Sequence, residues 1–152
     1  MADSEKTQLV LGLGNLLLSD EGFGVHVARM LLEEKVPGNT AVLDCGTASW
    51  YALPEMEKAA KLIVVDSIKG GNKAGTVYHI DVKTSKCNAG DGLTLHDIDF
   101  METLQWLKSS PSETIVLGVE PEKIAYGLEL SETVNSKIPT VIKLIQGELK
   151  KC

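Results

Sequence analysis

The chain has 152 residues, of which 43% are hydrophobic and 24% are charged. This ordinary globular composition excludes a disordered protein and predicts a single domain, 1–152, with its own core. The net charge of -6 argues against nucleic acid or an anionic membrane as the main partner, because both bind basic surfaces. No apolar run approaches the roughly 20 residues that span a bilayer, and the polar start MADSEKTQ lacks a signal-peptide core, so we expect a cytoplasmic protein.

The first half of the chain alternates apolar runs with segments of helical periodicity. A buried strand is predicted at about residues 8–13, followed by a tight turn at Gly12 and Gly14. A helix is predicted over Phe23–Glu34, with an inward face of Phe23, Val27, Met30 and Leu31, and Pro37-Gly38 is predicted to stop it. The next predicted elements are a strand at Thr40–Asp44, a helix within Ala48–Ala60 whose firm part starts near Leu53 because of Pro54, and a buried strand at Lys61–Asp66.

The second half continues the alternation. Thr76–Asp81 is predicted as an edge strand, and Lys83–Leu93 as a polar loop. The Thr94-x-x-Asp97 capping box predicts the start of a helix that carries Phe100, Leu104 and Leu107. The remaining predicted elements are a fifth strand at Glu113–Val119 and a last helix that Ser131 caps and Pro139 kinks, with Val134, Ile138, Val141, Ile145 and Leu149 on its apolar face. Such alternation predicts an α/β fold with a largely parallel sheet covered on both faces.

Three side chains that can bind a metal stand at the ends of different elements. Glu21 follows the first strand, Asp66 closes the third, and His96 lies in the first turn of the helix begun by Thr94. In a doubly wound sheet the first and third strands are neighbours, so Glu21 and Asp66 can converge at one edge. Two carboxylates and one imidazole suit a divalent transition metal with open positions.

Each member of this set has a simpler reading when taken alone, as a helix cap, a surface charge or a solvated side chain. His26 and His79 are interpreted as solvated. Asp20 is interpreted as a helix N-cap or a supporting acid, and Asp44 as a supporting residue or a turn residue. The candidates to support the metal ligands are therefore Asp20, Asp44 and Asn15.

Several enzyme motifs are absent from the sequence. The turn GLGNLL lacks the third glycine of the dinucleotide fingerprint, and neither a P-loop, G-x-S-x-G nor H-E-x-x-H occurs. No serine or cysteine has a histidine base assigned by a motif, so nucleophilic hydrolysis has no support. The cysteines Cys45, Cys87 and Cys152 are widely spaced, which favours free thiols over disulfides or a zinc site.

The ordered motifs GLGNLLLSDEGFGV, LDCGT, LIVVDS, the His96 segment, LGVEP and GLELSETV resemble the [NiFe]-hydrogenase maturation endopeptidases from about Leu9 to Val134. The resemblance implies a three-layer α/β/α sandwich around a mostly parallel five-stranded sheet with one antiparallel strand, for which Thr76–Asp81 is the natural candidate. It places the family's three metal-binding positions on Glu21, Asp66 and His96. Cys45 departs from the family, which usually has a second glycine there; it is interpreted as a small buried residue, although it adds a thiol near the site.

The resemblance also implies a cytoplasmic, metal-dependent endopeptidase that removes the C-terminal extension of a hydrogenase large-subunit precursor after nickel insertion. We expect the enzyme to recognise the nickel that its substrate carries, to need no organic cofactor, and to act as a monomer. The glycines of the first turn are then expected to give clearance for a metal-bearing peptide. The alternatives are a peptidyl-tRNA hydrolase, which shares the GLGN turn but not the Pro-Gly that follows it, and a non-catalytic metal-binding or nucleotide-binding module.

Overall fold

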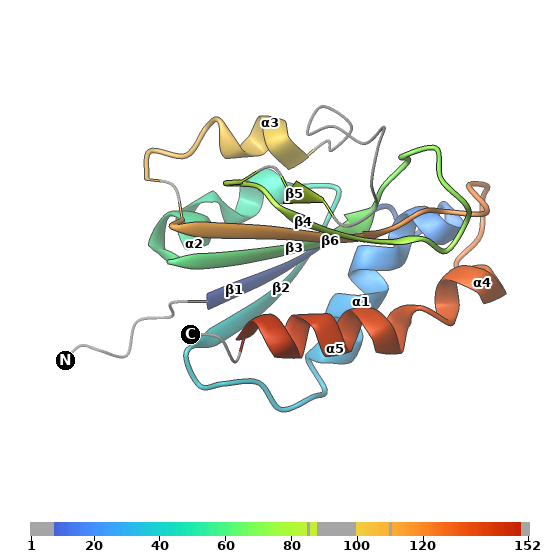
Figure 1. Cartoon of the computed structure of the whole chain (residues 1–152), viewed down its shortest axis with the longest axis horizontal. Coiled ribbons are helices and arrows are strands. Elements are labelled where there is room, and N and C mark those ends of the chain that lie inside the picture. Colours follow the sequence, from blue (N-terminus) through green and yellow to red (C-terminus); the bar gives the residue numbers. More distant parts are fainter. Residues whose placement is uncertain (1–7, 85, 88–99, 110, 150–152) are drawn as a thin grey trace.

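The computed structural model describes residues 8–84, 86–87, 100–109 and 111–149, and these contain one six-stranded sheet in the order β2-β1-β3-β6-β4-β5 (Figure 1). The strands are β1 (Gln8–Leu13), β2 (Thr40–Gly46), β3 (Lys61–Ser67), β4 (Val77–Asp81), β5 (Lys86–Cys87) and β6 (Glu113–Val119). The strands β2, β1, β3 and β6 are parallel neighbours, whereas β4 runs antiparallel to β6. The expected set of four parallel strands and one antiparallel strand is confirmed.

The prediction that β4 forms the edge of the sheet is wrong, because the two-residue strand β5 pairs with its outer side at Ile80 and Asp81. Strand β5 lies inside the segment predicted as a polar loop. An open strand edge offers unpaired N–H and C=O groups that any extended segment can use, whatever its side chains, so this pairing leaves no apolar pattern in the sequence. The capping box at Thr94 and Asp97 lies outside the described residues.

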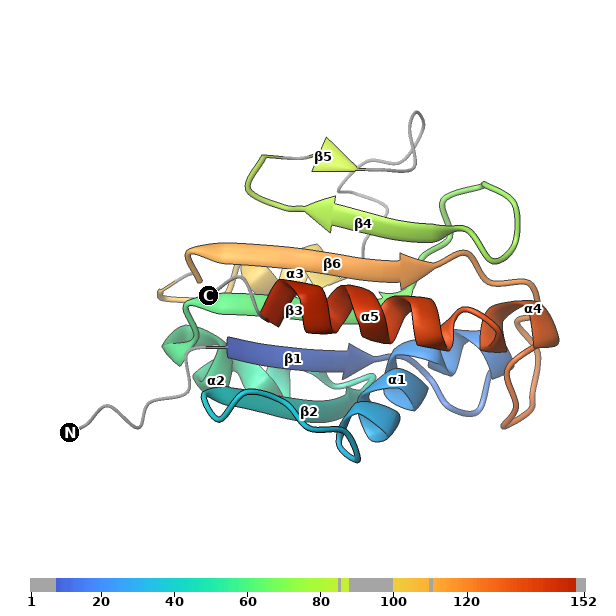
Figure 2. The ribbon, with the colours of Figure 1, turned by 60° about the horizontal axis from the view of Figure 1, so that its bottom comes forward.

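Helices cover both faces of the sheet, so the expected three-layer sandwich is confirmed (Figure 1). The first face carries the 3-10 helix η1 (Ser19–Gly22), α1 (Phe23–Leu31), α4 (Glu132–Asn135) and α5 (Ile138–Leu149). The second face carries the 3-10 helix η2 (Ser49–Ala52), α2 (Leu53–Lys58) and α3 (Phe100–Leu104). When the first face is turned forward, α5 crosses in front of the central strands and α1 lies beside it (Figure 2).

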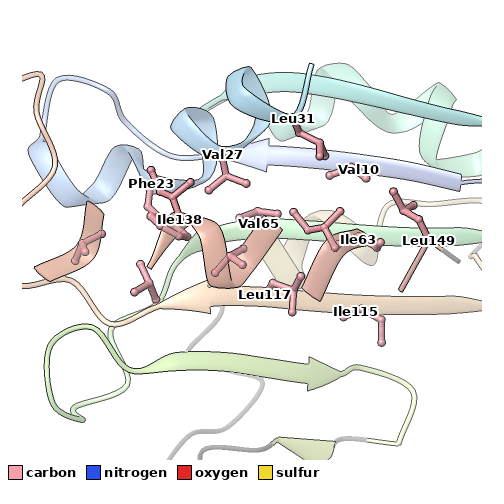
Figure 3. Close-up of a cluster of buried hydrophobic side chains, with 14 residues drawn as sticks. Val10, Phe23, Val27, Leu31, Ile63, Val65, Ile115, Leu117, Ile138 and Leu149 are labelled. Carbon is pink, nitrogen blue, oxygen red and sulfur yellow. The ribbon is translucent and has the colours of Figure 1, made fainter. Parts of the chain in front are cut away.

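Two apolar cores follow from the alternation of side chains along the central strands. In β1, Leu9 and Leu11 pack toward α2 and α3, whereas Val10 packs toward α1 and α5. The core on the α1 side gathers Phe23, Val27 and Leu31 of α1 with residues of three strands and of α5 (Figure 3). The predicted apolar face of the last helices is buried as well, at Val134, Ile138, Val141, Ile145 and Leu149.

The helix predicted over Phe23–Glu34 is shorter in the structure and ends at Leu31. Met30, which was expected on the inward face, is exposed. The helix ends early because the next amides tighten into turns of 3-10 type, in which Glu33 N donates to the carbonyl of Met30 and Glu34 N to that of Leu31. The predicted stop at Pro37-Gly38 is therefore not what ends this helix.

The last predicted helix is also divided. Ser131 caps α4 as expected, since its Oγ accepts a hydrogen bond from Val134 N at 3.3 Å. The helix then breaks at Ser136–Lys137 and restarts as α5 at Ile138. Pro139 therefore lies in the first turn of α5, where its missing N–H needs no partner, and the predicted mid-helix kink is wrong.

A buried charge cluster lies at the opposite end of β3 from Asp66. Lys61 Nζ lies 3.1 Å from Glu148 Oε1 of α5, and both side chains are buried. The ring of His79 meets the other carboxylate oxygen of Glu148 at 2.8 Å. The interpretation of His79 as a solvated side chain is wrong, because α5 brings a carboxylate across the sheet from a distant part of the sequence.

Candidate active site

A cavity of about 510 Å³ opens where the carboxyl ends of the central parallel strands meet. Its lining includes Glu21, which follows β1, and Asp66, which closes β3, and these two strands are paired directly. Both residues therefore line the same cavity, as the strand order predicts. The cavity is also lined by Asn15, Trp50, Lys69, Phe100 and Glu102.

Glu21 reaches this cavity because the first turn and α1 pack against each other without intervening side chains. Gly14 has a φ of +136°, and a Cβ there would lie 2.1 Å from the carbonyl oxygen of Glu21. A Cβ on Gly24 would lie 2.1 Å from the carbonyl oxygen of Val65 in β3. The clearance at Gly14 is thus used by the protein's own 3-10 helix η1, and its expected use by a substrate peptide stays a prediction.

Asp66 is half-buried at the end of β3, and its Oδ1 accepts a hydrogen bond from Ser67 N at 2.8 Å. The side chain of Glu21 is 28% exposed, and its Oε2 forms an ion pair with Lys69 Nζ at 3.5 Å. The ammonium group of Lys69 is a cation held beside one of the predicted metal ligands. Two carboxylates that face one cavity, one of them already beside a cation, fit a divalent metal by the chemistry of their donor atoms.

His96, the third predicted ligand, lies outside the described residues. Among the residues that the structure describes, no group of three or more His, Cys, Asp or Glu side chains is placed to hold a metal ion. The assignment of His96 to the site remains a prediction from the sequence.

Asp20, next to Glu21, turns away from the cavity and is fully buried. Its Oδ2 accepts hydrogen bonds from Glu122 N at 2.9 Å, Lys123 N at 2.7 Å and Ser131 Oγ at 2.8 Å, and its Oδ1 accepts one from Ser131 N at 2.7 Å. Its interpretation as a helix N-cap is wrong, because neither η1 nor α1 receives a side-chain cap. The side chain instead anchors the segment 122–131 beside the first turn, and so helps to position the turn that carries Glu21.

The other two candidates to support the ligands lie in different environments. Asn15 lines the cavity, and its Oδ1 accepts a hydrogen bond from Leu17 N at 2.9 Å, which closes the turn. Asp44 lies near the end of β2, outside the cavity lining, and pairs with Arg29 Nε at 2.9 Å. Asp44 is paired with Gly12 inside β2, so its interpretation as a turn residue is wrong, and its pairing with Arg29 outside the cavity lining gives no support to its interpretation as a supporting residue.

Cys45 is half-buried and packs against the core on the α2 side, as its interpretation as a small buried residue requires. Burial, together with the charges of Asp44 and Glu55, raises the pKa of its thiol. The thiol is therefore protonated at neutral pH when no metal ion is bound.

His26 is half-buried, and its interpretation as a solvated residue is wrong. Its Nε2 is buried and has no hydrogen-bond partner in the part of the chain that the structure describes. Burial and the charge of Arg29 lower the pKa of the ring, and this effect outweighs a backbone hydrogen bond at Leu128, which by itself would raise the pKa. The ring is therefore neutral at neutral pH. Helical periodicity could not show this, because the covering segment comes from residues about a hundred positions later.

Sequence reasoning also missed residues that shape the site. Lys69 and Trp50 line the cavity, while the buried Glu120 accepts hydrogen bonds from Gly70 N at 2.9 Å and Asn72 N at 3.2 Å and so holds the loop that carries Lys69. The motifs LIVVDS and LDCGT end just before Lys69 and Trp50, and LGVEP contains Glu120, but none of them indicates that these side chains meet at one cavity.

The fold and the cavity define an α/β sandwich protein with an acidic site at the carboxyl edge of its sheet. A family model described as HycI, hydrogenase maturation protease, matches residues 25–148, and the chain belongs to this family. The resemblance found in the sequence is thereby confirmed.

Individual relatives agree with this assignment. The chain is 35% identical over 148 residues to the hydrogenase expression/formation protein HupD of Rhodobacter capsulatus, covering 93% of this chain and 70% of that protein. Its structure is similar to that of the hydrogenase maturating endopeptidase HybD from E. coli, with a TM-score of 0.80, 28% identity, and coverage of 95% of this chain and 92% of that one. It is also similar to the hydrogenase 2 maturation peptidase of a Thaumarchaeota archaeon, with a TM-score of 0.74, 26% identity, and coverage of 95% and 99%. No helix in the described part of the chain has the length and apolarity needed to span a membrane.

Proposed function

We propose that this protein is a cytoplasmic endopeptidase that removes the C-terminal extension of a [NiFe]-hydrogenase large-subunit precursor once nickel has been inserted. The observation that carries the proposal is the meeting of Glu21 and Asp66 in one open cavity at the carboxyl edge of the sheet. Membership of the hydrogenase maturation protease family supports the reaction class and the type of substrate.

In this proposal the nickel ion belongs to the substrate. Glu21 and Asp66, together with His96, bind open positions on that ion and place the scissile peptide beside it. A metal ion held in this way polarises the peptide carbonyl or lowers the pKa of a bound water. The chain itself contributes recognition and orientation: a precursor without nickel lacks the group that these side chains bind, so it does not dock.

The hydroxyl groups in the cavity support a route without a protein nucleophile. Ser49 Oγ lies 2.9 Å from Thr103 Oγ1, so these two hydroxyls pair with each other. The cavity is also lined by Thr47 and Ser67, and no sequence motif assigns a histidine base to any of these hydroxyl groups. Because His96 is assigned to the metal, the proposal has water attack the peptide bond.

The experiment compares cleavage of purified precursor with and without nickel. We expect a shortened product only from the nickel-loaded precursor, and equal rates on both forms would refute nickel recognition. The variants Glu21→Gln, Asp66→Asn and His96→Ala should fold normally and lose cleavage, whereas Asp44→Asn, which removes a carboxylate outside the cavity, should keep it. Full activity in the three site variants would remove the site assignment.

The same mixture separates an enzyme from a binding module. A binding module would form a stoichiometric complex with the precursor and leave its C-terminus intact, whereas a protease releases the extension and then dissociates. Gel filtration of the free protein checks the expected monomer. Gel filtration of the mixture checks the complex with the precursor, which is the only partner that the proposal requires.

A further inference from the structure

Lys69 is the one cationic residue among the described residues that line the cavity, beside the carboxylates of Glu21, Asp66 and Glu102. Its Nζ lies 3.5 Å from Glu21 Oε2. The described lining of the cavity therefore contains three acidic residues, and its single ammonium group lies beside Glu21, one of the three proposed nickel ligands. A cation that binds the Oε2 atom of Glu21 therefore competes with this ammonium group.

The loop that carries Lys69 is held at both sides by buried groups. Before it, Ile68 N donates to the carbonyl of Val119 at 2.9 Å. After it, Gly70 N and Asn72 N donate to the Oε1 atom of Glu120, which Tyr78 OH also contacts. The backbone at Lys69 is thus fixed near the cavity by interactions that do not involve Glu21, while the side chain is 64% exposed and can move away from its partner.

We propose that Lys69 is an internal counter-ion that a cation must displace from Glu21, and that it makes the site discriminate against free divalent ions. The inference rests on the proposed function, in which Glu21 binds the nickel of the precursor. An ammonium group and a metal ion compete for the same carboxylate oxygen and repel each other, so Lys69 weakens the binding of any free ion. A docked precursor gains contacts over its whole interface, which offset this competition.

Lysine suits this role better than a rigid bidentate partner would. Its ammonium group is a point charge on a flexible stem, so it can leave the carboxylate without breaking a paired set of hydrogen bonds. The modest strength of an exposed ion pair is also what a displaceable counter-ion requires, because a stronger pair would exclude the substrate as well.

The test is a calorimetric titration of the full chain with Ni²⁺ alone, without precursor. Lys69→Met should bind Ni²⁺ roughly two- to fivefold more tightly than the wild type, the range expected for the loss of one exposed ion pair. This ratio should shrink when ionic strength is raised from about 0.05 M to about 0.5 M, because salt screens the ammonium group. Lys69→Arg, which keeps the charge and can pair with the carboxylate through two hydrogen bonds, should bind Ni²⁺ no more tightly than the wild type. Lys73→Met, which removes a lysine outside the cavity lining, should behave as the wild type does.

A double-mutant comparison links the effect to Glu21. In a Glu21→Gln background, Lys69→Met should no longer strengthen Ni²⁺ binding, because the contested carboxylate is gone. If Lys69→Met leaves affinity unchanged while Glu21→Gln weakens it, the inference is overturned and the proposed function stands. If Glu21→Gln and Asp66→Asn both bind as the wild type does, or if no variant binds Ni²⁺, the cation site itself is overturned. An equal gain in Lys73→Met would also overturn the inference, since the effect would then be one of net charge.

Discussion

Replacing Asp20 with asparagine tests whether one buried carboxylate anchors the segment 122–131 against the candidate site. In the wild type, Oδ2 accepts three hydrogen bonds and Oδ1 accepts one. Asparagine has nearly the same shape but only one acceptor oxygen, so its amide nitrogen must face either Ser131 N or the three donors at the other position. In both orientations the N–H groups of the asparagine side chain face N–H or O–H donors of the segment 122–131, so hydrogen bonds are lost. The negative charge that strengthened every hydrogen bond to Asp20 is lost as well.

The expected loss is about 2–4 kcal/mol in the free energy of unfolding. A buried donor without a partner costs about 1–3 kcal/mol, and the remaining bonds become weaker because their acceptor is neutral. For a domain of this size, each kcal/mol lowers the melting temperature by about 2–4 °C. Urea unfolding followed by circular dichroism at pH 7 measures the change. The matched control is Asp44→Asn, which breaks an exposed ion pair with Arg29 and should cost less than about 1 kcal/mol.

The pH dependence gives a second, independent readout. Burial alone would raise the pKa of Asp20, but the hydrogen bonds from Lys123, Ser131 and Glu122 outweigh it and hold the pKa below its usual 3.8. A carboxyl whose pKa is lower in the folded state stabilises the fold above the unfolded-state pKa, and this contribution is lost as pH falls through the folded-state pKa. The stability gap between the wild type and Asp20→Asn should therefore narrow below pH 3.8. A loss under about 0.5 kcal/mol at pH 7, the range of ordinary surface changes, or a gap that stays constant in acid would refute the reasoning.

Three further predictions concern the packing around the site and the opposite end of the sheet. In urea unfolding, Gly24→Ala should destabilise the fold by about 3 kcal/mol or more, because the added Cβ would clash with backbone carbonyls of β1 and β3. The control Gly147→Ala in α5 adds a Cβ that meets nothing within 4 Å, and it should stabilise the fold by about 0.5–1 kcal/mol. Lys61→Met should cost about 3–5 kcal/mol in urea unfolding because it leaves the buried Glu148 carboxylate without its ammonium partner, and adding Glu148→Gln should recover much of that loss. Burial and the hydrogen bond to the carboxylate of Glu120 raise the pKa of Tyr78 to about 12. An ultraviolet titration of the wild type should therefore show one tyrosine that ionises only near pH 12, and this late titration should be absent from Tyr78→Phe. The stability that the neutral phenol provides is present below pH 10 and is lost as pH rises through about 12; a tyrosine titration complete by pH 11 would contradict this prediction.

The parts of the fold that the sequence predicted are those with a local physical cause. Apolar runs placed the parallel strands, of which β1, β3 and β6 are buried on both faces between the two helical layers. Ser131 was recognisable as an N-cap because its hydroxyl serves an amide only three residues away. The errors lie where the cause is distant: β5 pairs through backbone groups alone, and His79 meets a carboxylate from α5.

The site divides in the same way. Glu21 and Asp66 could be placed at one edge because strand order in a doubly wound sheet brings the ends of β1 and β3 together. The adjacent acid Asp20 could not be assigned, since one step along the turn reverses the direction of a side chain and its donors lie more than a hundred residues away. Lys69 was missed for the same reason, because its position depends on Glu120 across the sheet edge.

The sequence by itself therefore determined the family, the α/β sandwich and the pair of strand-end carboxylates, because these depend on local periodicity and on general rules of strand order. Only the tertiary structure decided which of two neighbouring acids faces the cavity and which anchors a loop, and which cation lies beside Glu21. Those roles depend on hydrogen bonds and ion pairs between segments that lie far apart in the chain. The sequence gives only the type of each side chain and does not show the direction in which it points.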